Sequence, residues 1–279
     1  RSRYTVSGGY ATDTGIRGRF VWHNRRVNRS GPRWLVETTL SQIKQNAIAR
    51  YIIPIGDPSL EKLEVSGGYG HETLGDLDSE RFELIGSITQ VKKKWQRVLF
   101  LQVNDEVTTN PDGTESNVLL LIPGISFASL PPHFLTGWVR EAAYFAQLSG
   151  SPQTLGSDES FLRLYGSAER VWPLGGPWHL RVRGELGTTW VNDFSELPAS
   201  QRFFTGGDRT VRGFGLNELS PPPEDPNDVK ELGKSVGGEH LLVGSLELER
   251  DIRESWRATV FFDTGNAFNS WGDPLEYSV

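Results

Sequence analysis

Apolar and polar residues alternate along most of the chain with a period of two. Between residues 16 and 22 the even positions are apolar or glycine, whereas Arg17, Arg19 and His23 have the opposite parity. Residues 178–190 repeat this pattern, with arginine, histidine and glutamate opposite tryptophan, leucine and valine. Alternation of this kind is typical of a β-strand with one apolar and one polar face. It predicts an all-β protein in which helical periodicity is nearly absent.

About thirteen segments of roughly ten residues carry the alternation, and we expect each of them to be a strand of one antiparallel sheet. They lie near residues 4–13, 16–28, 33–41, 45–54, 61–73, 80–92, 96–107, 117–127, 135–149, 159–172, 178–191, 240–250 and 256–268. The connections differ in length: residues 173–177 predict a compact turn, whereas residues 110–115 and 149–154 predict polar loop tips. Short turns at one end and longer loops at the other are typical of a transmembrane β-barrel.

The composition fits such a barrel once its two faces are considered. The 279 residues carry a formal charge of −6 and have a mean hydropathy of −0.40. This polarity is compatible with a membrane barrel, because strands that alternate a lipid face with a wet lumen face average to moderate hydropathy. The sequence contains no stretch of about 18 consecutive apolar residues that would predict a membrane-spanning helix. A net negative charge does not favour nucleic acid as a partner.

The chain contains no cysteine and no methionine. A disulfide framework and a thiolate metal site are therefore excluded. The chain also begins at Arg1, without a start residue or a signal peptide. We therefore expect an excised fragment from which a targeting segment or a preceding domain has been removed.

A five-residue repeat supports the barrel. The sequence Val-Ser-Gly-Gly-Tyr occurs at residues 6–10 and again at residues 65–69, an interval of 65 − 6 = 59 residues that accommodates four strands. Paired glycines weaken a flat strand, but a barrel wall uses them where it curves or where another backbone packs closely. The repeat favours a regular wall, although five residues can also match by chance in a glycine-rich chain.

The alternation stops between residues 191 and 240, the longest unpatterned segment of the chain. Long loops in compact folds are usually functional. This loop carries Arg-Phe-Phe-Thr-Gly-Gly-Asp-Arg-Thr-Val-Arg-Gly-Phe at residues 202–214, followed by prolines at 221–223. The frame around Val-Arg-Gly-Phe resembles the characteristic loop of the BamA/TamA superfamily of outer-membrane assembly and secretion barrels. Residues 237–247 and the Phe-x-Asp-x-Gly segment at 260–268 resemble the two strands that follow this loop in that superfamily.

The resemblance, which is closest to the TamA branch, implies a barrel of sixteen strands with POTRA domains before it and a lateral seam between its first and last strands. Residues 1–279 would then be a partial barrel of about thirteen strands, from which the POTRA domains and about three closing strands are absent. Residues 191–240 would be a long loop folded into the lumen. An antiparallel sheet that cannot close exposes unpaired edges, so we expect that this fragment alone does not insert as a functional barrel.

The two strands after the loop predict a charged site. Glu247 shares its parity with Ser245 and alternates with leucines, and Asp263 alternates with valine and phenylalanine, so both carboxylates are expected to point inward. A loop folded back into the lumen would offer Arg212 to both, because a planar guanidinium engages carboxylates bidentately and stays charged. The alternative is a solvated loop arginine. We assign a structural and gating role, without chemistry, to six residues: Arg212, Gly213, Phe214, Glu247, Asp263 and Gly265.

The resemblance implies a factor that helps β-barrel proteins and autotransporters insert into the bacterial outer membrane. Its implied partners are an inner-membrane-anchored protein like TamB, client outer-membrane β-proteins and the lipid bilayer, and nucleic acid is not among them. A two-partner secretion pore, which shares these motifs but exports one cognate exoprotein, is the alternative. An outer-membrane barrel enzyme is a third and less favoured class.

No motif in the sequence favours catalysis or a cofactor. Residues 41–44 match the S-x-x-K signature of serine β-lactamases, which requires a helix, but they fall in an expected turn between strands. The histidines are isolated, and His71 with Glu72 lacks a second histidine at the spacing of a zinc site. The three lysines at residues 92–94 are expected to form a solvated turn. We therefore expect that the protein is not an enzyme and has no catalytic residue, no cofactor and no metal.

Overall fold

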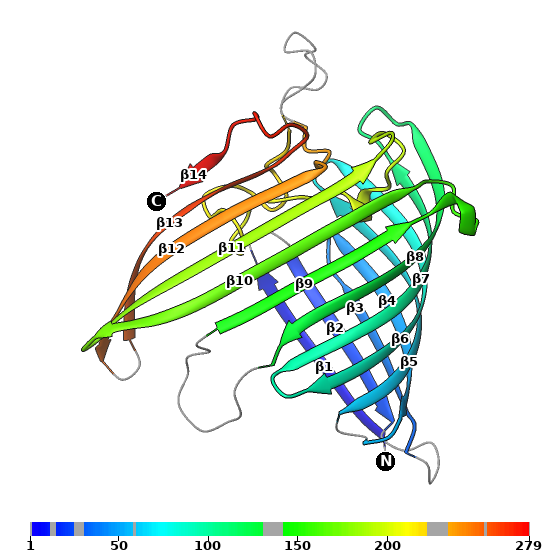
Figure 1. Ribbon diagram of the computed structural model, residues 1–279, viewed down its shortest axis with the longest axis horizontal. Helices are drawn as coiled ribbons and strands as arrows, with labels where there is room; N and C mark the ends of the chain where they lie inside the picture. Colours follow the sequence, from blue (N-terminus) through cyan, green and yellow to red (C-terminus); the bar gives the residue numbers. More distant parts are fainter. Residues whose placement is uncertain are drawn as a thin grey trace.

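The computed structural model describes residues 2–11, 15–24, 31–57, 60–130, 142–221, 234–253 and 256–278. Within these ranges, fourteen strands form one sheet (Figure 1). The strands are β1 (Ser2–Ala11), β2 (Gly15–Asn24), β3 (Arg33–Leu40), β4 (Lys44–Pro54), β5 (Glu61–Leu74), β6 (Leu77–Lys92), β7 (Trp95–Thr109), β8 (Glu115–Ser129), β9 (Ala142–Ser151), β10 (Phe161–Gly175), β11 (Trp178–Val191), β12 (His240–Arg253), β13 (Trp256–Phe268) and β14 (Glu276–Ser278). Two short 3₁₀ helices lie in the connections, η1 (Gln153–Leu155) and η2 (Ala199–Gln201). The predicted all-β class is confirmed.

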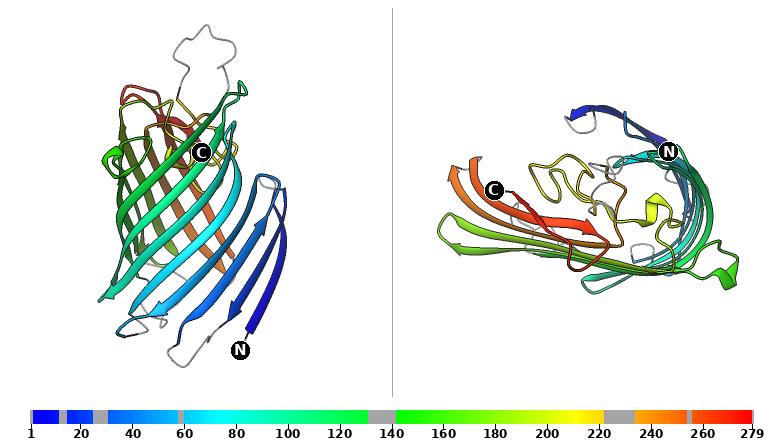
Figure 2. Two further views of the ribbon diagram at one scale, coloured as in Figure 1. Left: turned by 90° about the vertical axis from the view of Figure 1, so that its right-hand side faces the viewer. Right: turned by 90° about the horizontal axis from the view of Figure 1, so that it is seen from above.

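Each strand pairs with the next one along the chain, from β1 to β14 in sequence order. Neighbours that follow each other through short connections pair antiparallel, and the right-handed twist of such a sheet curls it around a central space. Figure 2 shows this curvature from above, with the wall bent around its interior. The sheet stays open between β1 and β14, which are not paired in the part of the chain that is described.

The two faces of the sheet differ in polarity as the alternation predicts. On β12, Leu246 and Leu248 are 49% and 40% exposed on the outer face, whereas Ser245 and Glu249 are 3% exposed on the inner face. β6 has the same alternation: Leu84 and the neighbouring even-numbered residues are exposed on the outer face, and the odd-numbered residues between them are more buried. A continuous apolar outer face is stable next to lipid and costly next to water. None of the helical segments in the described ranges has the length or the apolar character to cross a membrane.

All thirteen predicted segments contain a strand, but several boundaries differ. The predicted loop 149–154 is partly wrong, because β9 continues to Ser151 and pairs there with Phe161 of β10. The predicted turn 173–177 is tighter than expected, since β10 reaches Gly175 and only Gly176 and Pro177 connect it to β11. The sequence missed β14, which has three residues and is too short to show alternation. The predicted strand portions 12–13, 25–28 and 135–141 and the prolines at 222 and 223 lie outside the described residues.

Both copies of the glycine repeat lie in the wall, in β1 and β5, four strands apart. In β5, a Cβ atom on Gly68 would lie 2.9 Å from the backbone oxygen of Ala47 in the neighbouring β4. Glycine is therefore required at this position because another backbone packs closely, as expected for a curved wall. Residues 41–43 form a turn in which Ser41 Oγ accepts a hydrogen bond from the backbone N–H of Lys44, so the S-x-x-K match is not on a helix.

The described part of the 191–240 segment, residues 192–221 and 234–239, folds back inside the curve of the wall (Figure 2). Two buried apolar clusters fix it there. One packs Leu197 of this loop against Val118, Leu120 and Ile122 of β8 and Phe161 of β10. The second cluster lies at β12 and β13, where the predicted site residues meet.

Candidate functional site

The loop reaches β12 and β13 through an apolar cluster. Val211, next to the predicted arginine, has no exposed surface. Its cluster contains residues from the loop and from both strands: Phe203, Val211, Leu219, Leu241, Val243 and Ala267. Burying side chains of this size stabilises by roughly 1.5–3 kcal/mol each, which holds the loop backbone against the inner wall. The position of the loop is therefore fixed before any charge is considered.

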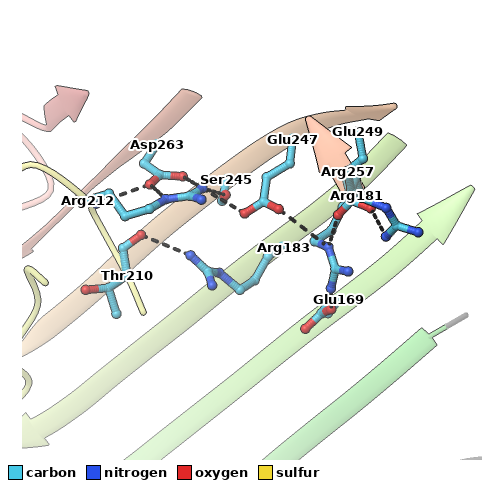
Figure 3. A network of polar contacts seen from close by, with 10 residues as sticks. All are labelled: Glu169, Arg181, Arg183, Thr210, Arg212, Ser245, Glu247, Glu249, Arg257 and Asp263. Atoms are coloured by element: carbon cyan, nitrogen blue, oxygen red, sulfur yellow. Dashed lines mark hydrogen bonds and ion pairs between the residues drawn. The ribbon is translucent and has the colours of Figure 1, made fainter. Parts of the chain in front are cut away.

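Arg212 makes the polar contacts of the site (Figure 3). Its Nε and Nη2 donate to the two carboxylate oxygens of Asp263 at 2.6 and 2.8 Å. The same Nη2 lies 2.7 Å from Glu247 Oε1 and donates to Ser245 Oγ at 3.2 Å. The guanidinium also stacks over the Phe261 ring, 3.7 Å from its centroid. One planar cation thus joins β12 and β13 to the loop, which requires the fork geometry of arginine.

Burial makes this ion pair strong and costly to break. The Asp263 side chain has no exposed surface, whereas that of Arg212 is 22% exposed. The backbone N–H of Arg212 also donates to Asp263 Oδ2 at 3.1 Å, so the carboxylate receives three donors from one residue. The side-chain hydrogen bond that Arg212 donates to Asp263 raises the pKa of Arg212 above its ordinary value, so the guanidinium stays protonated. A carboxylate buried in this way depends on its partner, and removing that partner costs roughly 3–5 kcal/mol.

The other predicted site residues supply backbone space and packing. Gly213 has φ +91°, a conformation that favours glycine. A Cβ atom on Gly265 would lie 2.5 Å from the backbone oxygen of Leu242, so β12 and β13 approach closely beside Asp263. Phe214 is partly buried and packs against the apolar cluster around Val211. The structure therefore brings all six predicted residues to one place, and their gating role stays a prediction.

The sequence missed a second cation that shares the site. Arg181 of β11 lies 3.5 Å from Glu247 Oε2 and donates to Glu249 Oε1 at 2.7 Å, and it also pairs with Glu169 of β10 (Figure 3). Arg257 of β13 also binds Glu249, with its Nη1 donating to Glu249 Oε2 at 2.5 Å. The cross-strand register places Arg181 directly opposite Glu247. The alternation predicts that both side chains point inward, but it does not predict the register that makes them neighbours.

The missed contact at the other end of the loop holds it to a different part of the wall. Glu106 of β7 has no exposed surface and accepts hydrogen bonds from Ser79 Oγ at 2.8 Å and Asn104 Nδ2 at 3.0 Å. It also accepts the backbone N–H of Ser200 in η2 at 3.0 Å, together with the Ser200 hydroxyl. A buried carboxylate satisfied by donors from two elements fixes those elements to each other. The loop is therefore fixed both at β7 and at β12–β13.

Arg202, the first residue of the loop motif, organises the loop internally. It is 8% exposed and donates to the backbone oxygens of Leu197 at 2.7 Å, Ser195 at 3.1 Å and Val236 at 3.2 Å. Burial lowers its pKa to about 10, which still leaves the guanidinium charged at neutral pH. Arg202 thus joins the two described parts of the loop, because Leu197 and Ser195 lie in residues 192–221 and Val236 lies in residues 234–239.

The site offers no evident place for a metal. In the ranges that the structure describes, no three histidine, cysteine or acidic side chains are grouped so as to hold a metal ion. The carboxylates of the site are instead paired with arginines, which occupy the oxygens that a cation would need. The arrangement can hold the loop against β12 and β13 through charge-assisted hydrogen bonds.

Part of this chain is similar in sequence to known proteins. Residues 141–278 match the family model of the Omp85 superfamily domain. The outer membrane protein assembly factor BamA of Nitratidesulfovibrio vulgaris is 27% identical over 142 residues, which are 48% of this chain and 17% of that protein.

Two solved structures share the fold. The crystal structure of BamA from Haemophilus ducreyi lacking POTRA domains 1–3 has a TM-score of 0.80 and 16% identity, over 96% of this chain and 58% of that one. CdiB from Acinetobacter baumannii has a TM-score of 0.57 and 11% identity, over 98% of this chain and 50% of that one. The chain thus spans less than two thirds of each relative. These likenesses show the fold, and the motif-bearing half carries the family match.

Proposed function

We propose that this chain, whose residues 141–278 are an Omp85 superfamily domain, is the barrel of an assembly factor of the TamA kind that helps β-barrel proteins and autotransporters insert into the outer membrane. The bacterial outer membrane is the location of the chain, in agreement with its exposed apolar outer face. The superfamily is one of outer-membrane assembly and secretion barrels. The TamA role, the clients and the partners belong to the proposal.

The observation that carries the proposal is the clamp between Arg212, Glu247 and Asp263. It fixes residues 192–221 and 234–239 against β12 and β13, the last long strands of the sheet. A loop held by ion pairs has two states, clamped and released, and the clamp decides how far β13 can move. The proposal is that the clamp keeps these strands in register while a client strand pairs with the wall.

The client would bind by β-augmentation. A strand edge with free N–H and C=O groups templates an incoming strand, and main-chain hydrogen bonds provide the affinity. In the proposed protein, residues 191–240 form the lumen loop, POTRA domains precede the barrel, and closing strands complete it. A TamB-like protein anchored in the inner membrane and the lipid bilayer are the proposed partners. No cofactor takes part.

The test is Arg212→Ala in the full-length protein, with Arg209→Ala as the matched control. Arg209 lies in the same loop and is exposed, so its loss removes a positive charge without touching the clamp. We expect Arg212→Ala to lower the amounts of several β-barrel proteins in the outer membrane, close to the level of a gene deletion, while strand content is retained. Arg209→Ala should match the wild type.

Two results would contradict the proposal in different ways. Loss of one secreted protein with unchanged β-barrel proteins in the deletion strain would favour a two-partner secretion pore. An unchanged outer-membrane profile for Arg212→Ala, together with an undisturbed loop, would contradict the gating role of the clamp.

A further inference from the structure

The wall of the sheet is incomplete between β8 and β9. These strands pair only from Gly124 with Ser149 to Ala128 with Phe145, although β8 begins nine residues before Gly124, at Glu115 (124 − 115 = 9). On its other edge β8 pairs with β7 along its whole length. The ladder stops because β9 ends at Ser151, two residues after Ser149, and the edge of β8 beyond it is contacted by Ser157 and Asp158 of the connection to β10. This happens at the end of the sheet that carries the long loop, since the 109–115, 151–161 and 191–240 connections all lie at the same end of an up-and-down sheet.

A groove of about 760 Å³ lies where the strands part. Most of its lining is apolar and comes from strands on both flanks: Leu99, Pro123, Ile125, Leu148, Leu162 and Trp190. The polar lining residues are Ser149, Ser151, Ser160 and Asn192. Several of the apolar residues belong to the exposed outer face, among them Leu162 at 47% and Trp190 at 54%. Gly150 lies between them without a side chain, and a Cβ atom there would come within 2.8 Å of the backbone oxygen of Phe161. The groove is thus continuous with the lipid-facing surface.

The edge of β8 in this gap has little to offer a strand. The backbone N–H of Leu119 donates to Asp158 Oδ2 at 2.7 Å, and that of Leu121 donates to Ser157 Oγ at 2.9 Å. The next position on this edge is Pro123, which has no N–H. β-Augmentation requires free ladder donors, whereas a hydrocarbon chain requires none. The chemistry of the gap therefore favours an apolar occupant without hydrogen-bonding groups.

We propose that the groove between β8 and β9 binds one acyl chain of an outer-membrane lipid. On the lumen side the gap is backed by the apolar cluster of Val118, Leu120, Ile122, Phe161 and Leu197. A chain held in the groove completes the apolar outer face where the strand ladder stops, and van der Waals contacts with the groove wall supply the affinity, because a chain that comes from the bilayer gains nothing by leaving water.

The first test measures whether an acyl chain stays at Trp190. The full-length protein is reconstituted in vesicles of phosphatidylcholine with brominated acyl chains and is then exchanged into detergent until bulk lipid is removed. The contribution of Trp190 to the fluorescence is obtained by subtracting the emission of the Trp190→Phe variant from that of the unmodified protein. Trp178, at the other end of the same strand and also on the outer face, is the control and is isolated in the same way with Trp178→Phe.

We expect Trp190 to remain quenched by bromine while Trp178 recovers its emission. Equal recovery of both tryptophans would overturn the proposal, because the retained chain would then be absent or elsewhere.

The second test fills the groove. Native mass spectrometry counts the phospholipid retained by the wild type, by Leu148→Trp/Leu162→Trp and by the control Leu246→Trp/Leu248→Trp on the outer face of β12. We expect one retained lipid in the wild type and in the control, and its loss in the groove variant. Retention by the groove variant, no retention by the wild type, or a co-purified peptide in place of lipid would each overturn the proposal.

Discussion

Replacing Arg212 by lysine is the sharpest test of the clamp, because it keeps the charge and removes the fork. Lysine can place one ammonium near Asp263 or Glu247, whereas Arg212 reaches both, with Nε and Nη2 on Asp263 at 2.6 and 2.8 Å and Nη2 on Glu247 at 2.7 Å. Two charge-assisted hydrogen bonds are therefore lost, each worth roughly 1.5 kcal/mol at the lower end of the usual range. We take the lower end because the Arg212 side chain is 22% exposed. The expected loss is about 3 kcal/mol in the free energy of releasing the loop.

A loss of this size raises the released population of the loop more than about a hundredfold. Hydrogen exchange measures that population, so peptides covering residues 203–219 should exchange faster by a similar factor in Arg212→Lys. Arg209→Lys is the control, since Arg209 is exposed in the same loop. Exchange in peptides from β5 to β7 should not change, because those strands do not touch the clamp. Unchanged protection of residues 203–219 would refute the reasoning that the bidentate geometry holds the loop.

Three further substitutions test the surroundings of the site. Glu106→Gln should lower the free energy of thermal unfolding by less than about 1 kcal/mol, because the buried Asn104 Oδ1 has no partner and can accept from the new amide once the Asn104 amide flips. Glu106→Ala should lower it by about 3 kcal/mol, because it leaves buried donors unpaired. Arg181→Met should accelerate exchange of the loop less than Arg212→Lys does, and the double variant should be non-additive, since both arginines pair with Glu247. Gly68→Ala should lower the melting temperature, because its Cβ meets a backbone oxygen at 2.9 Å, while Gly86→Ala, with nothing within 4 Å, should not.

The strands could be predicted from the sequence because successive side chains of a strand point to opposite faces, so a sheet with one apolar and one polar face requires alternating residue types. The same parity argument places Glu247 and Asp263 on the inner face, and the loop motif predicts that Arg212 lies between them. Parity fixes which face a side chain is on, and it holds along each strand independently of its neighbours. This part of the site was therefore predictable from single strands.

The remainder depends on distances along the sheet that no single strand contains. Glu106 lies on a strand far from η2 in sequence, and its contact with Ser200 joins residues 94 positions apart. Arg181 pairs with Glu247 through the register of β11 and β12, which the turn geometry and the whole sheet determine. The early end of the β8–β9 ladder likewise leaves no mark in the alternation of β8, whose residues 115–123 have no β9 partner and alternate like the rest. Register and pairing are properties of two strands at once, and a periodic pattern reports only one.

The two fixed ends of the loop differ in chemistry, and that difference assigns them different tasks. At Glu106 a buried carboxylate accepts from Ser79 and Asn104 of the wall and from Ser200 of the loop, so separation of the loop would leave the N–H and the hydroxyl of Ser200 without this acceptor. At Arg212 the cation is partly exposed, and Glu247 keeps Arg181 as a second partner after release. Glu247 therefore keeps a charged partner after release, whereas at β7 the loop donors of Ser200 would lose a fully buried carboxylate acceptor. We therefore expect the contact at β12–β13 to release before the contact at β7, so that the loop stays attached to the wall at Glu106.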